Sequence, residues 1–405
     1  MNAPSFLTDA ARTEIPQQGL SKRVELLAIL GLAVVARVVC WNQRPPDMEI
    51  FLEPWFAHIV HYGPVQAFAH PFSNYEPAYL YLLALGSLAH GLFTTMTIIK
   101  IISVAGTLFL TWALADVLKA ARVEPRGALL LLVLPSVVFN DALLAQCDAL
   151  WAGSTILALA AIIRGNTVRS MIWCGVAIAF KAQAAFMAPV IIGAMIGRRA
   201  PWWQWLVPAF VFLATLVPPW LLGWPGMKLL TVYLDQAALD QLAGRLSNPW
   251  MLGTIFAERL ARNLFFVGYI AAGAAAATIA ALAARNYRDP KLLILLAAIS
   301  GTALPFLLPK MLERYYFLGD VMTLALALSY KNKESAFALR AVQLASILAH
   351  FTYMYFFDHP YPALVGALCA GAGLVAMCQL ATPSFNALVA DTRSLWRNRR
   401  QRMSA

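Results

Sequence analysis

Apolar runs of roughly 20 residues recur along most of the chain, and this is the length that a helix needs to cross a bilayer. Hydrophobic residues make up 60% of the 405 positions and charged residues only 13%, where a soluble domain would carry about 25% charged residues. In lipid, a helix satisfies its backbone hydrogen bonds within itself. We therefore predict an all-α polytopic membrane protein whose single domain, residues 1–405, is the helical bundle.

The positions of the positively charged residues predict which segments lie on the cytoplasmic side of the membrane. The formal net charge is +11, but the lysines and arginines stand in short clusters between apolar runs. This pattern is typical of the cytoplasmic loops of a membrane protein, and it argues against nucleic acid as a partner. Lys22 and Arg23 precede the first run, which predicts a cytoplasmic tail over residues 1–23. A basic cluster after the last run predicts a second cytoplasmic tail over residues 383–405.

The charge clusters also predict how many times the chain crosses the membrane. We predict about twelve crossings, with both termini cytoplasmic. Residues 42–96 then form a long first outer loop with interfacial helices, in which 77–93 does not cross. Arginines flank the run 171–197 on both sides, which predicts two half-helices that meet at residues 180–189. The full crossings are expected near 24–41, 97–118, 127–142, 149–164, 202–222, 262–284, 290–308, 314–330, 336–357 and 361–381.

Acidic residues are concentrated where the first crossing ends. Asp47 and Glu49 follow this run closely. Asp47 is placed to cap the next helix, and it is equally placed to act as a general base that faces a water-filled cavity. Both interpretations stay open at this point. His58 and His61 with Glu53 imitate a metal site, although solvated interface residues explain them better.

Two further polar stretches lie near the ends of predicted crossings. Asn74 and Tyr75 belong to a stretch whose tyrosines suit either the aromatic belt of the interface or a substrate-binding role. Asp148, two residues after Gln146, stands at the start of a predicted membrane helix that is otherwise apolar. An ionisable residue there is costly unless it faces a cavity or a partner, which favours a functional role.

A lysine stands at the junction of the two half-helices. Lys181 and Gln183 occupy this junction, where irregular backbone lines a cavity. Such a lysine can bind a phosphate. The alternative is that Lys181 neutralises Asp148 or Asp141 for stability alone.

The stretch "LPKMLERYYFLGD", residues 308–320, brings cations, an acid and aromatic rings together. Lys310 and Arg314 offer positive charge, Glu313 accepts hydrogen bonds, and Tyr315 offers an aromatic face. Side chains that reach from the apolar layer to the bilayer surface are the alternative explanation. The cations make the stretch a candidate site for a phosphate.

The order of these motifs resembles that of a known family. An aspartate after the first helix, a tryptophan on the next helix, and then "NYEP", "QCD", "FKAQ" and "MLERYYF" occur here in sequence. The series resembles the GT-C glycosyltransferases, specifically the bacterial relatives of GPI mannosyltransferase II. It is more distantly similar to the dolichyl-phosphate-glucose-dependent glucosyltransferases. The resemblance covers about residues 24–330, most of the chain.

The resemblance implies an inverting hexosyltransferase. Such an enzyme moves a hexose, mannose or glucose, from a polyprenyl phosphate to an extracytoplasmic glycolipid, polysaccharide or protein. The implied location is the plasma membrane of a bacterium, with the active site outside the cytoplasm. No cofactor is expected, and a divalent metal is left open. A non-catalytic lipid-handling protein and a secondary transporter are the alternative functions.

The resemblance also implies roles for particular residues. Its essential acid falls on Asp47, which we predict to be the catalytic base. Leu312 stands where the family pattern has a histidine, so the donor phosphate falls to Lys181, Lys310 and Arg314. The predicted substrate-binding residues are Glu49, Asn74, Tyr75, Gln146, Asp148, Gln183, Glu313 and Tyr315.

Overall fold

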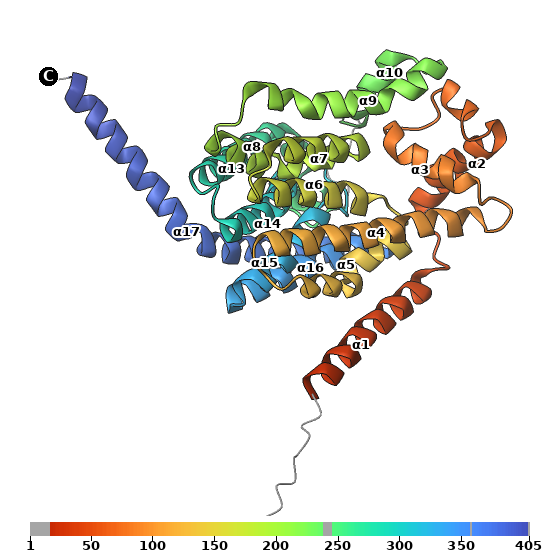
Figure 1. The fold of residues 1–405 in the computed structure, drawn as a ribbon, viewed down its shortest axis with the longest axis horizontal. Coiled ribbons are helices and arrows are strands. Elements are labelled where there is room, and N and C mark those ends of the chain that lie inside the picture. The colour runs from red at the N-terminus through yellow and green to blue at the C-terminus, as the bar shows by residue number, and fades with distance from the viewer. Residues whose placement is uncertain (1–16, 238–244, 357–358, 404–405) are drawn as a thin grey trace, which may run out of the picture.

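The computed structural model describes residues 17–237, 245–356 and 359–403, which form helices joined by short loops (Figure 1). Within these ranges no β-strand occurs, and extended pairing is limited to two isolated bridges. The predicted all-α class is therefore confirmed. Of the tail predicted at 1–23, residues 1–16 lie outside the described part of the chain, and helix α1 (Gln17–Cys40) begins within the remainder.

Six of the described helices are long and apolar enough to cross a bilayer, and a bent pair makes a seventh if it counts as one span. Several other apolar helices have only 10–17 residues. At 1.5 Å per residue these are shorter than the roughly 30 Å apolar layer. The count of about twelve crossings thus stays a prediction. The six helices are Arg23–Trp41, Thr95–Ala120, Trp202–Leu222, Phe265–Arg285, Pro290–Leu307 and Tyr361–Ser394.

The bent pair replaces the single crossing that the sequence predicts at 127–142. A 3₁₀-helix, η3 (Pro125–Val133), is followed by a short α5 (Pro135–Val138) and a π-helical turn, η4 (Phe139–Leu143). Leu134 takes an extended conformation before Pro135, because proline disfavours a helical residue ahead of it. The two parts meet at 60°, which turns η4 into the interior of the bundle.

The predicted pair of half-helices is confirmed. Helix α7 (Thr167–Phe180) ends one residue before Lys181, which is extended, with φ −158° and ψ 146°. A 3₁₀ turn, η5 (Ala182–Met187), then leads into α8 (Ala188–Gly197). The break leaves the backbone around Lys181 irregular, and such backbone is tolerated at membrane depth when it is buried in protein or lines a cavity.

The predicted outer loop 42–96 contains short helices that form one end of the molecule (Figure 1). Of the apolar residues on its first helices, Trp55 and Ile59 are buried while Phe51 and Tyr62 are exposed. Phe51 lies in a π-helical turn, so it falls out of register with the α-helix that follows. At 11 residues, α3 is too short for a full crossing. The helices are η1 (Met48–Leu52), α2 (Glu53–Tyr62), η2 (Gln66–Ala69) and α3 (Pro77–Ser87).

Helix α1 is tied to the bundle by a buried ion pair. The Arg37 guanidinium contacts the Asp141 carboxylate of η4 at 2.6 Å and donates to the Leu132 carbonyl oxygen at 2.8 Å. Asp141 is fully buried, and a charge in that position is costly unless it is paired. Elsewhere α1 exposes valines and leucines, as expected of a helix that faces lipid.

A second buried cation fixes the start of the outer loop. The Lys100 ammonium of α4 (Thr95–Ala120) donates to the carbonyl oxygens of Cys40, Trp41 and Gln43, at 3.2, 2.5 and 2.7 Å. These carbonyls are at or just beyond the end of α1, where a helix lacks internal partners for them. Lys100 therefore holds the chain just ahead of Asp47.

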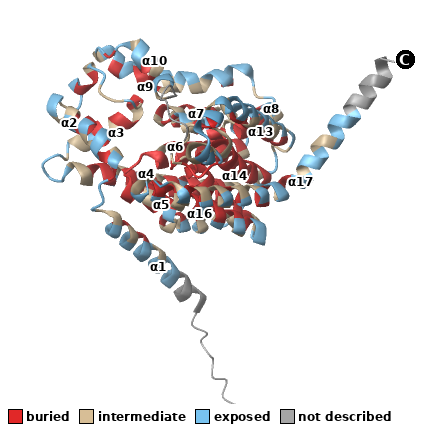
Figure 2. Cartoon of the chain, turned by 180° about the vertical axis from the view of Figure 1, so that it is seen from behind, coloured by how far each residue is buried: buried red, intermediate tan, exposed pale blue. Residues whose placement is uncertain are grey.

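Buried residues gather in the middle of the bundle, along α4, α6, α14 and α16 (Figure 2). Helix α6 is buried over nearly its whole length. Its N-terminus, at Asp148, faces the loop between α14 and α15 and the junction of the half-helices at Lys181. The ranges are α6 (Asp148–Ile163), α14 (Pro290–Leu307), α15 (Phe317–Tyr330) and α16 (Lys333–Tyr355).

The remaining helices surround this core. The tail predicted at 383–405 is not a separate segment, because α17 (Tyr361–Met403) runs through Pro383 and its end projects from the bundle (Figure 1). An ion pair between Arg285 and Asp391 joins α17 to α13. The others are η6 (Trp202–Leu206), α9 (Val207–Leu222), α10 (Gly226–Ala237), α11 (Trp250–Phe256), α12 (Glu258–Asn263) and α13 (Phe265–Arg285).

Candidate functional site

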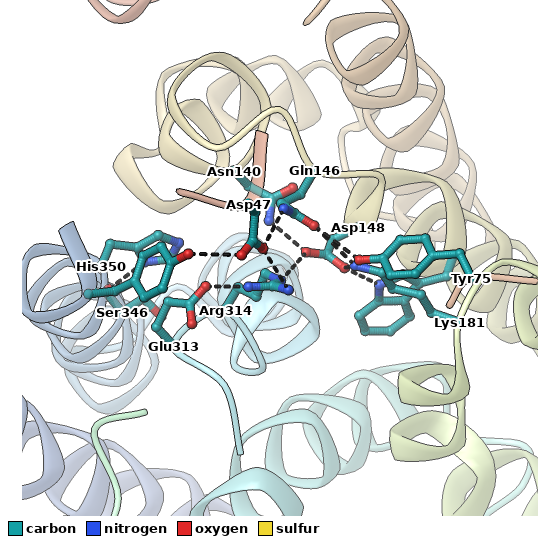
Figure 3. Close-up of polar contacts among 12 residues, drawn as sticks. Asp47, Tyr75, Asn140, Gln146, Asp148, Lys181, Glu313, Arg314, Ser346 and His350 are labelled. Atoms are coloured by element: carbon teal, nitrogen blue, oxygen red, sulfur yellow. Dashed lines mark hydrogen bonds and ion pairs between the residues drawn. The ribbon is translucent and has the colours of Figure 1, made fainter. Parts of the chain in front are cut away.

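Asp47 lies at the centre of a cluster of polar side chains between the outer loop and the bundle (Figure 3). Tyr353 of α16 donates its hydroxyl hydrogen to Asp47 Oδ1 at 2.8 Å. Gln146 Nε2 donates to Asp47 Oδ2 at 3.1 Å. The Arg314 guanidinium lies 3.2 Å from the same Oδ2. The Asp47 carboxylate thus joins three segments that are far apart in the sequence.

Asp47 does not cap a helix through its side chain. It precedes η1 with a helical backbone, φ −60° and ψ −30°, and its side chain makes no capping hydrogen bond. A capping residue instead has an extended backbone and accepts from an amide of the first turn. The structure therefore contradicts the capping interpretation, and the carboxylate is directed to Tyr353, Gln146 and Arg314.

Gln146 links the carboxylate of Asp47 to the cationic side of the cluster. Its amide oxygen accepts from the Tyr75 hydroxyl at 3.3 Å and from Lys181 Nζ at 3.4 Å. Only the amide oxygen accepts and only the amide nitrogen donates. The nitrogen must therefore face Asp47, and the orientation of the amide follows from its neighbours.

Asp148 forms the second carboxylate of the cluster, at the start of α6. Lys181 Nζ lies 2.7 Å from Asp148 Oδ1, and Trp151 Nε1 donates to the same oxygen at 2.8 Å. Asn140 Nδ2 donates to Oδ2 at 2.8 Å. A purely stabilising role for Lys181 also requires an ion pair with Asp148. This contact alone therefore does not distinguish a stabilising role of Lys181 from a phosphate-binding role.

Arg314 is shared among three carboxylates. It bonds Glu313 Oε1 through Nη1 and Asp47 Oδ2 through Nη2, and its Nε lies 3.8 Å from Asp148 Oδ2. At that distance Nε makes no hydrogen bond, and it is buried. A buried N–H donor without a partner is costly. A bound anion would give this N–H group a hydrogen-bond partner and remove that cost.

Among the described residues, the ion pairs of the cluster join three acids to two cations. Asp47, Asp148 and Glu313 pair with Lys181 and Arg314. Burial raises the pKa of Glu313, and its Oε2 has no hydrogen-bond partner. Protonation of Glu313 would leave two carboxylates opposite two cations. Asp47 is the most accessible of the three acids, with 17% of its side chain exposed against 4% for Asp148 and 1% for Glu313.

Two of the predicted substrate-binding residues lie away from the cluster. The Glu49 side chain is 56% exposed and pairs with Arg44, because the π-helical turn directs it outward. Asn74 is exposed, and its carbonyl oxygen accepts from the side chain of Gln236. Glu49 and Asn74 therefore lie outside the cluster, and a substrate-binding role for them stays a prediction.

Other predicted residues lie at the edge of the cluster. The Tyr75 ring faces Lys181 Nζ at 5.0 Å from the ring centre. Gln183 and Tyr315 are half-buried. Lys310 is half-buried in the loop that carries Arg314, with a left-handed φ of 63°. Of these side chains, Tyr75 and Gln183 lie beside the junction at Lys181.

The histidines that imitate a metal site have other contacts. His58 Nε2 is hydrogen-bonded to the Ala67 carbonyl oxygen at 3.1 Å, and its ring stacks on Phe72 at 4.4 Å. Over the described ranges, no group of three or more histidine, cysteine or acidic side chains is arranged to hold a metal ion. The expectation that no cofactor is needed stays untested.

Three partners of the cluster were not predicted from the sequence. Tyr353 is 306 residues from Asp47, on α16, and belongs to none of the sequence motifs named above. Asn140 and Trp151 lie on either side of Asp148 in the sequence, but no local pattern marks them as its ligands. The only signal for Asn140 is its place in an apolar run, where an amide needs a partner.

Glu76 is a buried acid outside the cluster. Both of its carboxylate oxygens lack hydrogen-bond partners, and burial raises the pKa of Glu76 to about 8. The folded protein therefore binds this proton more tightly than the unfolded chain, whose ordinary value is 4.5. The free energy of unfolding should fall as the pH rises from about 4.5 to about 8.

Glu76→Gln removes this titration, and we expect its thermal midpoint at pH 8 to exceed that of the wild type by a few degrees. At pH 5 the two midpoints should be similar, because the acid is then neutral. Thermal unfolding in detergent between pH 5 and 8 measures the difference, with the exposed Glu124→Gln as the control. Parallel curves for wild type and Glu76→Gln would show that this acid is not buried in its neutral form.

Comparison with known proteins does not identify a family. No family model matches the chain, and a search of curated proteins finds no match either. The resemblance to GT-C glycosyltransferases therefore remains an expectation. What the protein does has to be argued from the cluster and from the membrane-length helices.

Proposed function

We propose that this membrane protein is an inverting glycosyltransferase. It takes a hexose from a polyprenyl phosphate and transfers it to a hydroxyl of an acceptor. The observation that carries the proposal is the position of Asp47. This partly exposed carboxylate lies 3.2 Å from the buried Arg314 and is linked through Gln146 to the buried Lys181, at the junction of the outer loop and the bundle.

The cluster supplies the groups that such a reaction needs. Inverting transfer requires a base on the face of the sugar opposite the leaving group, by the same logic as inverting glycosidases. Asp47 suits this role because its side chain is the most exposed of the three acids in the cluster. Lys181 and Arg314 suit a phosphate, because charge-assisted bonds to phosphate are strong and Arg314 has an unpaired Nε.

The acceptor hydroxyl oxygen forms a bond to the anomeric carbon, and its proton passes to Asp47. The bond between the anomeric carbon and the phosphate oxygen breaks, and its electron pair leaves with the phosphate. A singly charged phosphodiester thereby becomes a phosphomonoester with a charge of about −2 near neutral pH. Lys181 and Arg314 stabilise this increase in negative charge, which is electrostatic catalysis.

Arg314 links binding of the donor phosphate to the contacts of the base, Asp47. A phosphate that binds Arg314 competes with Asp47 for the same guanidinium. As Arg314 turns to the phosphate, Asp47 keeps only the neutral donors Tyr353 and Gln146. Neutral donors stabilise a carboxylate less than a cation does. Donor binding would therefore release Asp47 from its ion pair with Arg314.

We also propose the orientation in the membrane. The site faces the extracytoplasmic side of a bacterial plasma membrane, and both termini are cytoplasmic, which follows from the positive charge of the predicted inner loops. A lipid-borne donor explains why the cluster lies where membrane-length helices meet the outer loop. The acceptor would be a glycolipid, a polysaccharide or a protein.

The test is transfer from a defined donor. Purified protein in lipid nanodiscs is incubated with polyprenyl-phosphate mannose or glucose, labelled in the sugar, together with membrane lipids, polysaccharide or peptide. We expect labelled product with one donor and one acceptor, and none with Asp47→Asn. A folded protein that yields no product with any pair would contradict the proposal and favour the lipid-handling or transport alternatives.

A further inference from the structure

We propose that a cavity between α1, η4 and α16 binds an uncharged membrane lipid through a free hydroxyl group, which donates a hydrogen bond to His350. The cavity has a volume of about 140 Å³ and lies where α1 and α16 end, at the start of the outer loop. Figure 3 shows His350 at the side of the Asp47 cluster away from Lys181. The lining residues take no part in the ion pairs of that cluster, so the lipid site is separate from the proposed transfer reaction.

His350 brings an unpaired hydrogen-bond acceptor to this cavity. Its side chain is only 2% exposed, and its Nδ1 lies 2.6 Å from the Ser346 carbonyl oxygen. A carbonyl oxygen can only accept, so Nδ1 carries the hydrogen. An unpaired buried charge is costly, which favours the neutral ring with Nε2 as an acceptor. Nε2 has no hydrogen-bond partner among the described residues, so a ligand that donates a hydrogen bond would satisfy it.

The other walls of the cavity favour hydrocarbon. The centre of the Phe139 ring lies 5.9 Å from the rings of both His350 and Phe351, and Leu143 and Met354 add aliphatic surface. The described residues that line the cavity include no lysine, arginine, aspartate or glutamate. A phosphate headgroup would therefore have no cation to pair with. A neutral lipid with a free hydroxyl needs only the imidazole and the apolar walls.

The size and the open edge of the cavity indicate a ligand with a long chain. An apolar cavity of about 150 Å³ holds benzene, so this one holds the hydroxyl-bearing end of a lipid and roughly six carbon atoms. Val39 forms the edge on α1 and is 72% exposed. Val35 and Leu32 continue the same face of α1 and are also exposed. The rest of the chain can therefore lie along α1 in the bilayer.

The experiment uses Cys40, a free cysteine that lines the cavity, to report its occupancy. Full-length protein in phosphatidylcholine nanodiscs is treated with N-ethylmaleimide, and peptide mass spectrometry follows the alkylation rates of Cys40 and of the exposed Cys378 as internal control. We expect dioleoylglycerol to slow the alkylation of Cys40 and to leave Cys378 unchanged. The dioleoyl ester of propylene glycol, which lacks only the free hydroxyl, should require a concentration about 3- to 10-fold higher, the factor for one hydrogen bond between neutral groups.

Equal protection by the two lipids would overturn the hydrogen bond to His350, and no protection by either would overturn the lipid site. His350→Phe keeps an aromatic ring but removes the acceptor, so the two lipids should then protect Cys40 equally. Because they are compared within one variant, the result stays informative if this substitution lowers stability. His61→Phe, at an exposed histidine of the outer loop, should keep the wild-type difference. A difference that persists in His350→Phe would contradict the inference.

A second pair of variants tests the position of the lipid. Val39→Trp places a large ring at the edge of the cavity and should abolish protection by dioleoylglycerol. Val38→Trp alters an exposed valine of the same helix that does not line the cavity, and it should behave as wild type. Full protection in Val39→Trp would place the lipid elsewhere and overturn the inference. The readout requires no sugar transfer, so failure of the lipid site and failure of the proposed function are distinguishable.

Discussion

Asp47→Asn is expected to lower the rate of sugar transfer by about 10²–10⁴, the usual contribution of a positioned general base. Asparagine keeps the shape of the side chain but cannot take up the acceptor proton. It also leaves helix capping unchanged, because Asp47 makes no capping bond. The loss should appear in kcat with little change in binding of the sugar donor, since the donor is held by cations.

The measurement is steady-state transfer at saturating donor, together with donor binding by each variant. Glu53→Gln is the matched control, because Glu53 is an acid of the same loop that pairs with Arg44 outside the cluster. Thermal unfolding of Asp47→Asn checks that the fold survives the loss of charge beside Arg314. Near-normal transfer by Asp47→Asn would reduce this residue to a structural partner and direct attention to Asp148.

Arg314→Lys is expected to weaken binding of the polyprenyl-phosphate sugar about tenfold or more, a factor that corresponds to about 1.4 kcal/mol. Lysine keeps the positive charge but cannot reach a phosphate and three carboxylates with a planar fork of N–H groups. One charge-assisted bond to phosphate is worth roughly 1.5–3 kcal/mol. Loss of the Nε donor alone is therefore enough for the effect.

The charge-preserving variant is needed because Arg314 also holds the cluster together. Arg314→Ala would remove the cation that Asp47, Asp148 and Glu313 share, and breaking a buried pair costs about 3–5 kcal/mol. We expect that variant to unfold early and to say little about the donor. Arg164→Lys, which alters a half-exposed pair with Asp116, is the control. Unchanged donor affinity in Arg314→Lys would move the phosphate site elsewhere.

Much of the helical architecture could be predicted from the sequence. Apolar runs determine helices because lipid offers no other partner to the backbone. The break at Lys181 was also predictable, because arginines flank a run that is too long for one crossing and too short for two. The bend of 60° at Pro135 was not predicted. Pro135 marks where the helix is interrupted, but the angle depends on how the two short helices pack against α4 and α1.

The charged residues of the site could also be identified from the sequence. Asp47, Asp148, Lys181 and Arg314 stand out because ionisable residues are rare and costly near the membrane. Glu49 stands out for the same reason, yet the structure directs it outward to Arg44. Local sequence shows that a charge is present, but the turn that carries it decides which way it points.

The sequence by itself determined the membrane class, the helices and the short list of charged residues. Only the tertiary structure decided which of them meet. Asp141 pairs with Arg37 rather than Lys181, and Asp47 receives its hydrogen bond from Tyr353, 306 residues away. The physical reason is that a buried charge must find a partner within a few ångströms, while its helix can supply only neighbours three or four residues along. The remaining partners come from the packing of distant helices.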